Sequence, residues 1–266
     1  MISIDDIVSL DYAGVEKKIA GFLRDFFGKA GIKRAVLGVS GGVDSATTLY
    51  LLVRTLGPEN VTALIMPDPE ATPPEDLRDA RRITKELGVE VWEAPIGNVV
   101  DALKKSLPYY DEKHVVALGN LKARVRMCML YYYANTRRAI VVGTGDRSEI
   151  LIGYFTKYGD GGVDVLPIGN LYKSQVRRLA LHLGVDKSIA FKPSSPRLWP
   201  GQSAEGELGL SYEEIDLILY AYFDRKIPLS EIPRETGIPE NKVKAVLDRV
   251  KSTSHKRQLP PIAPIT

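Results

Sequence analysis

Short apolar runs alternate with helix-like segments through the first two-thirds of the chain. The segments between the runs carry apolar residues at helical spacing, as in 15–30, 44–57, 73–88 and 114–136. The runs themselves are 34–39 (RAVLGV), 61–67 (VTALIMP), 89–96 (VEVWEAPI) and 139–145 (AIVVGTG). Buried strands separated by helices are typical of a parallel sheet covered on both faces. The pattern therefore predicts an α/β fold with a doubly wound, Rossmann-like parallel sheet.

The last third of the chain does not continue the alternation of strands and helices. A helical segment at 172–184 precedes a stretch rich in Pro, Ser and Gly at 192–209, which is too long for an ordinary connection and is expected to be functional or mobile. Residues 211–251 contain two or three short helical segments punctuated by prolines. We expect one domain over 1–266, with an α/β core at about 30–185 and, at about 186–266, a mobile loop, a C-terminal helical annex and a tail.

Composition narrows the class of protein. Hydrophobic residues at 44% and charged residues at 26% are close to the averages of globular domains. A net charge of +3 is much weaker than the basic bias of a dedicated nucleic-acid-binding domain, and it suits an anionic small molecule. No segment reaches the roughly 18 apolar residues of a membrane span, and the acidic start is unlike a signal peptide. We expect a cytoplasmic protein that binds neither nucleic acid nor membrane.

Cys128 is the only cysteine of the chain. A single cysteine excludes an internal disulfide and a CxxC metal site within this chain. Because Cys128 lies in an apolar stretch of the 114–136 segment, we expect a buried side chain that behaves as a small hydrophobic group.

The segment SGGVDS at 40–45 joins the first strand to the next helix. Ligands of open α/β sheets bind outside the carboxyl ends of the strands, where this segment lies. Gly41 and Gly42 remove side chains so that the backbone can approach an anion, and the following helix points its free N–H groups at it. Ser40 and Ser45 add hydroxyl donors. We predict a pyrophosphate-binding loop, distinct from a Walker A loop because no Gly-Lys-Ser/Thr ends it.

Asp44 and Glu149 are candidate metal ligands. The carboxylate of Asp44 would repel phosphates unless a cation lies between them, so we expect a Mg²⁺ bridge. Glu149 and Thr144 follow the fourth strand at the same sheet edge, and a second Mg²⁺ at Glu149 would neutralise pyrophosphate as it leaves. From the residues alone, Glu149 fits equally well as an ordinary acidic residue in the first turn of a helix.

Five segments carry a resemblance to known proteins. LGVSGGVDSA at 37–46 is similar to the signature of the PP-loop ATP pyrophosphatase superfamily, whose members split ATP into AMP and pyrophosphate while adenylating a carbonyl oxygen. The others are NLKARVRM (120–127), VVGTGDRSE (141–149), GYFTKYGDGGVD (153–164) and His255-Lys256. Together they resemble the ammonia-dependent NAD synthetase family over about residues 15–260, and TKYGDGG is the most specific piece.

The resemblance implies an adenine nucleotide alpha hydrolase-like fold and a set of site residues. It assigns catalytic roles to Asp44 and Lys173, and metal binding to Asp44 and Glu149. Substrate contacts fall on Arg124, Lys157, Asp164, His255 and Lys256. ATP contacts fall on Gly38, Val39, Ser40, Gly41, Gly42, Val43, Asp44, Ser45, Thr144, Lys173 and Ser195, with Ser194 as the adjacent alternative to Ser195.

The resemblance also implies a reaction, the final step of NAD biosynthesis. The nicotinate carboxylate of deamido-NAD attacks the α-phosphorus of Mg-ATP, and ammonia then displaces AMP to form NAD. We expect free ammonia because the chain has no room for a glutaminase domain, while a separate glutaminase partner stays open. A homodimer is expected from the resemblance and from the apolar content of 15–30 and 114–136.

Two other functions would fit part of this sequence, and one position differs from the family. A tRNA-thiolating or GMP-forming relative would share the loop, although thiolation usually needs cysteine pairs. A non-catalytic ATP sensor would not need both Asp44 and Glu149. Relatives commonly carry an Asp near Ala204, so the role of that position is in doubt here, and Glu205 is a candidate to replace it.

Overall fold

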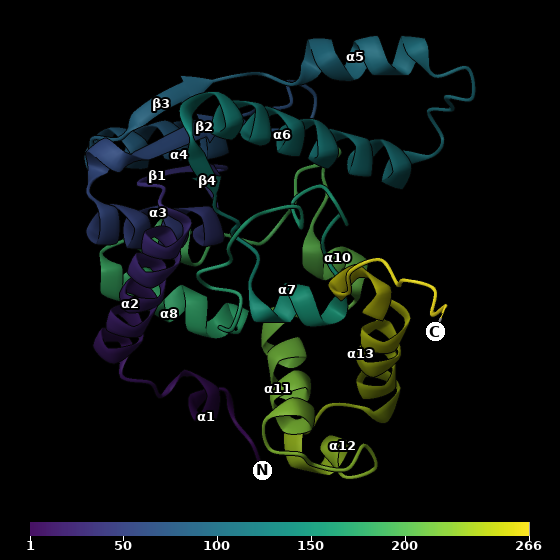
Figure 1. The fold of residues 1–266 in the computed structure, drawn as a ribbon. Helices are drawn as coiled ribbons and strands as arrows, with labels where there is room; N and C mark the ends of the chain where they lie inside the picture. The colour runs from purple at the N-terminus through teal and green to yellow at the C-terminus, as the bar shows by residue number, and fades with distance from the viewer. Residues whose placement is uncertain (266) are drawn as a thin grey trace.

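The computed structural model describes residues 1–265 and has a four-stranded sheet between two layers of helices (Figure 1). Every strand pairing is parallel, which confirms the doubly wound α/β class. The order is β3-β2-β1-β4. The strands are β1 (Arg34–Gly38), β2 (Val61–Ile65), β3 (Glu90–Glu93) and β4 (Ala139–Val141).

This strand order determines where a ligand can bind. The chain steps outward from β1 to β3 and then returns to place β4 beside β1. The loops after β1 and β4 therefore leave the sheet in opposite directions and open a crevice between them. The predicted phosphate loop and the Gly143–Glu149 segment both border this crevice.

Alternate side chains of the strands face two different cores. Ala35, Leu37 and Ile140 pack against one helical layer, and Val36 and Val141 pack against the other. β3 is the exception, because all four of its residues are exposed at the sheet edge. The first layer contains α2 (Tyr12–Ala30), α3 (Val43–Leu56), α4 (Pro74–Leu87) and α8 (Lys173–Leu183), and the second contains α5 (Gly97–Ser106) and α6 (Val115–Arg137).

The C-terminal part is helical, as expected. α11 (Tyr212–Phe223), α12 (Ile232–Thr236) and α13 (Glu240–Ser252) share a separate core with α1 (Ile4–Val8) and α7 (Arg147–Ile152). Figure 1 places these helices below the sheet, with α7 between the sheet and α11. Short elements complete the chain: η1 (Pro58–Asn60), α9 (Lys187–Ala190), α10 (Ala204–Leu208) and η2 (Ser254–Arg257).

The expectation of a buried Cys128 is wrong. Its side chain is exposed on α6, on the same side as the exposed Arg124 one turn earlier. The buried side of α6 is formed instead by Ala123, Val125 and Ala134. Apolar neighbours in the sequence did not indicate burial here, because they lie on other sides of the helix.

Among residues 1–265, no helix is both long enough and apolar enough to cross a bilayer.

Asp216 of α11 ties the helical annex to the α/β core. Its carboxylate is fully buried and accepts hydrogen bonds from the hydroxyls of Ser148 and Ser174 and from the Ser174 N–H at 2.8 Å. Those serines lie in the first turns of α7 and α8, so one carboxylate joins three helices. Burial raises the pKa of Asp216 to about 7, against the opposing effect of these hydrogen bonds.

This pKa predicts a stability change with pH. Because the folded-state pKa is above the unfolded value near 3.9, the folded state holds the extra proton between these pH values, and the free energy of unfolding falls as pH rises. Asp216→Asn removes this contribution. From pH 5 to pH 7, the free energy of unfolding of the wild type, measured by urea denaturation, should fall by about 2 kcal/mol relative to that of the variant. A difference that stayed constant over this range would contradict the assignment.

Candidate active site

A cavity of ≈ 420 Å³ lies at the carboxyl ends of β1, β2 and β4, under the 193–202 segment. It has the size and position of a small-molecule site in this type of sheet. Several residues predicted from sequence line it: Gly38, Val39, Ser40, Gly42, Val43, Asp44, Thr144, Glu149, Ser195 and Lys256.

The SGGVDS segment forms a compact loop that leads into α3. The Ser40 N–H donates to Ser45 Oγ at 3.2 Å, and Ser45 Oγ donates to the Gly42 carbonyl at 3.1 Å. Gly41 has a φ of +80°, and a Cβ at that position would lie 2.1 Å from the backbone oxygen of Asp76. Only glycine fits there, because both the backbone conformation and the contact with α4 exclude a side chain.

Three carboxylates and one lysine meet beside this loop. Lys173 Nζ lies 2.6 Å from Asp44 Oδ2, 2.8 Å from Asp146 Oδ2 and 2.9 Å from Glu149 Oε1. Asp44 comes from the start of α3, Asp146 and Glu149 from the start of α7, and Lys173 from the start of α8. The predicted Asp44, Glu149 and Lys173 are therefore brought together, and Asp146 is an additional member that the sequence analysis missed.

Burial sets the electrostatics of this cluster. Burial alone would lower the pKa of Lys173, but Asp146, Asp44 and Glu149 outweigh it and hold the pKa well above its ordinary value. Burial also raises the pKa of Glu149 well above the ordinary range, and the neighbouring Asp146 and Asp44 add to this rise. Lys173 thus carries a proton, and its charge is the main stabilising partner of the carboxylates.

Local structure orients each group. Asp146 is the N-cap of α7, because its carboxylate accepts a hydrogen bond from the Glu149 N–H at 2.8 Å. The Glu149 carboxylate in turn accepts a hydrogen bond from the Asp146 N–H, which completes a capping box. The Lys173 N–H donates to Ser148 Oγ at 3.0 Å, and its ammonium lies 5.0 Å from the ring centroid of the buried Tyr212. The Asp-x-x-Glu spacing of a capping box was readable in the sequence and could have identified Asp146.

The cluster also fits a divalent cation. One oxygen each from Asp44, Asp146 and Glu149 lies within 4.8 Å of the other two. Asp44 Oδ1 is buried without a hydrogen-bond partner among residues 1–265. Carboxylate oxygens are the protein ligands that Mg²⁺ prefers. In this structure the Lys173 ammonium supplies the positive charge at that position.

Four of the predicted substrate residues form a second group, linked by hydrogen bonds to backbone carbonyls. Arg124 Nη2 donates to the Lys157 carbonyl at 3.3 Å, and Lys157 Nζ donates to the His255 carbonyl at 2.8 Å. Lys256 Nζ donates to the carbonyls of Gly153 and Phe155, each at 2.8 Å. Of these, only Lys256 lines the cavity.

Asp164 makes different contacts from the rest of that group. Its carboxylate accepts from the Tyr131 hydroxyl at 2.9 Å and from the Val141 N–H at 2.8 Å. The carboxylate thus fixes α6 to the end of β4. Its role in substrate binding stays a prediction, as do those of Arg124, Lys157, His255 and Lys256.

The two adjacent serines of the 193–202 segment differ in their bonding. Ser195 Oγ donates to the Gln202 carbonyl at 2.6 Å and accepts from the Arg197 N–H. Ser194 Oγ is buried without a hydrogen-bond partner among residues 1–265, and Ser194 also lines the cavity. The hydroxyl of Ser194 is therefore the more available of the two for a ligand.

Ala204 lines the cavity with a nearly fully buried methyl group. Glu205 points away, and its carboxylate accepts from the Tyr212 N–H at 3.3 Å. Glu207 lines the cavity instead and accepts from Tyr154 Oη at 2.9 Å and Gln202 Nε2 at 2.6 Å. The carboxylate of α10 that lines the cavity is thus Glu207, one turn after Ala204.

Arg126 is a further lining residue that the sequence left unassigned. Its Nε donates to the Met66 carbonyl at 3.0 Å at the end of β2, while Arg124 is exposed on the other side of α6. Residues two apart in a helix lie on different faces, as Arg124 and Arg126 do here. Burial lowers the pKa of Arg126, and Asp68 and Asp160 partly offset the effect.

A glycine-rich loop at the switch point of a doubly wound sheet, beside a carboxylate cluster, defines an α/β protein of the PP-loop class. The family model described as NAD synthase matches residues 15–260, and the chain belongs to this family. An NH(3)-dependent NAD(+) synthetase from Hyperthermus butylicus is 55% identical over 98% of this chain and 94% of its own.

Solved structures agree with this family. The NMN synthetase of Francisella tularensis has a TM-score of 0.85 and 33% identity, over 97% of this chain and all of that one. The NH3-dependent NAD synthetase of Campylobacter jejuni has a TM-score of 0.81 and 30% identity, over 96% of this chain and 100% of that one. Both likenesses extend over the α/β core and the helical annex.

The buried cluster predicts the effect of removing its cation. Lys173→Met leaves three carboxylates in close contact and should lower the free energy of unfolding by about 3–5 kcal/mol. A second change, Asp146→Asn, removes one of the repelling charges and should recover part of this loss. Lys242→Met, which breaks the exposed pair with Glu214, is the control and should change stability by about 1 kcal/mol or less. Equal losses in Lys173→Met and the control, measured by urea denaturation, would contradict this assignment.

Proposed function

We propose that the chain catalyses the ATP-dependent amidation of deamido-NAD to NAD with ammonia, releasing AMP and pyrophosphate. The observation that carries the proposal is the cavity itself. It combines an anion-binding loop with the Asp44–Asp146–Glu149–Lys173 cluster in a chain of the NAD synthase family. Such a site suits a reaction in which charge develops on transferring phosphate groups.

The phosphate loop and the cluster have separate roles in this proposal. The N–H groups at the start of α3, with Ser40 and Ser45, hold the pyrophosphate end of ATP. Asp44 and Glu149, supported by Asp146, hold Mg²⁺, which when bound neutralises the phosphate charge. Lys173 is close enough to this position to stabilise the same charge. Thr144 and the backbone from Gly38 to Val43 complete the ATP contacts, and Ser194 is a better candidate than Ser195.

The chemistry needs positioning more than a protein nucleophile. A carboxylate oxygen of the nicotinate forms a bond to the α-phosphorus while the bond from that phosphorus to pyrophosphate breaks. Ammonia then attacks the carbonyl carbon of the adenylate, loses a proton, and AMP leaves. We place the dinucleotide on the side of Arg124, Lys157, Asp164, His255 and Lys256. Lys256 lines the cavity, and hydrogen bonds join Arg124 to Lys157 and Lys157 to His255, the neighbour of Lys256 in the chain.

The nitrogen source, the location and the division of the chain belong to the same proposal. Ammonia as the nitrogen source follows the names of the relatives, and supply by a glutaminase partner would be an addition to the same site. We also propose a cytoplasmic location. The division into a nucleotide-binding core at about 30–185 and a mobile loop, helices and substrate-binding tail at about 186–266 stays part of the proposal.

The deciding assay is incubation with deamido-NAD, ATP, Mg²⁺ and an ammonium salt. NAD, AMP and pyrophosphate should appear in equal amounts, and chelation of the metal with EDTA should reduce the rate by about 100-fold or more. Nicotinate mononucleotide is the matched alternative substrate, because one similar structure is named an NMN synthetase. Faster amidation of the mononucleotide would change the substrate, and ADP as the product would overturn the mechanism.

A homodimer is also proposed. α6 exposes Val115, Val116 and Tyr132, which together with the amphipathic α2 offer apolar surface for a second copy. Light scattering at micromolar concentration should give twice the mass of the 29.4 kDa chain. Tyr132→Asp should shift the equilibrium toward monomer if α6 is the contact, and a wild-type monomer under these conditions would overturn the proposal.

A further inference from the structure

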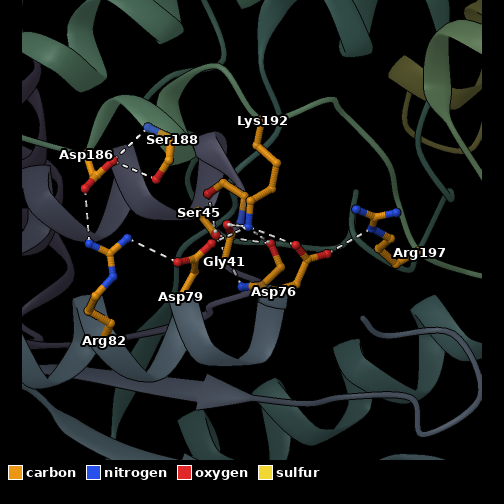
Figure 2. A network of polar contacts seen from close by, with 11 residues as sticks. Gly41, Ser45, Asp76, Asp79, Arg82, Asp186, Ser188, Lys192 and Arg197 are labelled. Carbon is orange, nitrogen blue, oxygen red and sulfur yellow. Dashed lines mark hydrogen bonds and ion pairs between the residues drawn. The ribbon is translucent and has the colours of Figure 1, made fainter. Parts of the chain in front are cut away.

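Lys192 lines the cavity and makes three contacts with the phosphate loop and α4 (Figure 2). Its ammonium donates to the Gly41 carbonyl at 3.0 Å, to Asp76 Oδ1 at 2.9 Å and to Asp79 Oδ2 at 2.5 Å. The side chain is 15% exposed. These contacts use all three N–H groups of the ammonium, so Lys192 has no donor left for a bound ligand.

The hydrogen bond from Lys192 to the Gly41 carbonyl determines how the Gly41–Gly42 peptide is oriented. No peptide bond in residues 1–265 is cis, so the Gly41 carbonyl and the Gly42 N–H point to opposite sides of their plane. The carbonyl points toward Lys192, and the N–H points into the loop, toward Ser40 Oγ at 3.3 Å. If this peptide rotated, a carbonyl oxygen would replace that N–H on the side of Ser40 and Gly42, both of which line the cavity.

Gly41 has the conformational freedom to make that rotation. Its φ of +80° is accessible to glycine, and so are several other conformations, because no Cβ restricts it. The backbone of α4 packs against its Cα, where it excludes a side chain but does not hydrogen-bond the carbonyl. Among the described residues, Lys192 is the side chain that holds this carbonyl by a charged hydrogen bond.

The two carboxylates keep the ammonium in place. Asp76 also accepts from Arg197 Nε at 2.9 Å, and Asp79 also pairs with Arg82 at 3.1 Å, which in turn pairs with Asp186. Figure 2 shows this chain of charges running along the first turns of α4. Lys192 is thus fixed by α4 and directed at the phosphate loop.

We infer that Lys192 is a positioning residue for pyrophosphate: it holds the Gly41–Gly42 peptide with its N–H toward the anion. This inference rests on the proposed function, since it takes the pyrophosphate of ATP as the ligand of the loop. It separates Lys192 from Lys173, whose ammonium contacts the carboxylates of Asp44, Asp146 and Glu149 and not the loop backbone. Lys192 lines the cavity, but its three N–H groups are already used, so it acts through the backbone of Gly41.

The test is binding of inorganic pyrophosphate with Mg²⁺, measured by calorimetry without turnover. Lys192→Met should weaken pyrophosphate binding by about 10- to 100-fold, as expected for loss of a charged hydrogen bond that orients a binding group. Lys192→Arg should lose less, because it keeps the charge but matches three convergent acceptors less well. Binding of deamido-NAD alone should change less than about twofold in both variants.

Two further variants separate positioning from simple ion pairing. Lys104→Met removes an equally covered lysine that pairs with Glu70 and Asp101, and it should leave pyrophosphate binding at the wild-type value. Asp79→Asn breaks an ion pair of Lys192 but keeps its hydrogen bond to Gly41, so it should lose less than about threefold. A loss in Asp79→Asn as large as in Lys192→Met would overturn the positioning role.

The outcomes also separate this inference from the proposed function. Equal pyrophosphate affinity in wild type and Lys192→Met overturns the inference alone. No pyrophosphate binding by the wild type overturns both. If thermal unfolding shows that Lys192→Met does not fold, Lys192→Arg decides: wild-type affinity for pyrophosphate in that variant would overturn the inference, and a selective loss would support it.

Discussion

The Lys173 ammonium is the interaction on which the arrangement of the site depends. It is fully buried and pairs with carboxylates from two segments that follow different strands. A buried charge without partners would cost several kcal/mol, so Lys173, Asp44, Asp146 and Glu149 are stable only in each other's presence. The starts of α3, α7 and α8 are therefore held at fixed distances from the sheet edge. The position of the crevice follows from the strand order, while its width follows from this cluster.

The same groups that stabilise the fold are those a metal would use. Asp44 Oδ1 has no hydrogen-bond partner among residues 1–265, so an oxygen ligand for a cation remains beside Lys173. The buried Asp216 supports the cluster through Ser148. The Ser148 hydroxyl donates to the Asp216 carboxylate and accepts from the Lys173 N–H, so that it connects the two residues. Stability and ligand chemistry thus share one set of contacts.

Sequence reasoning worked where the determinant was local or followed from the sheet. The loop at 40–45 was predictable because glycines, serines and a helix start are adjacent in the chain. Asp44 and Glu149 could be placed together because both follow parallel strands. The pairing of Lys173 with both depends on how α8 packs, which no spacing reveals. Asp146 was missed because its pattern is that of a helix cap, and Lys192 because its acceptors lie on α4, more than a hundred residues away in the chain.

Two lysines hold the phosphate loop at two different residues. Lys173, at the start of α8, contacts the Asp44 side chain, and Lys192, just after α9, contacts the Gly41 carbonyl. Because α8 and α9 pack against each other and against α3 in the same core, the two contacts are parts of one rigid unit. The hydrogen bonds inside the loop are long, at 3.1–3.3 Å, so these two outside contacts add to what fixes its shape. A glycine-rich loop that is flexible by composition becomes a defined binding site because the rest of the fold fixes it at two points.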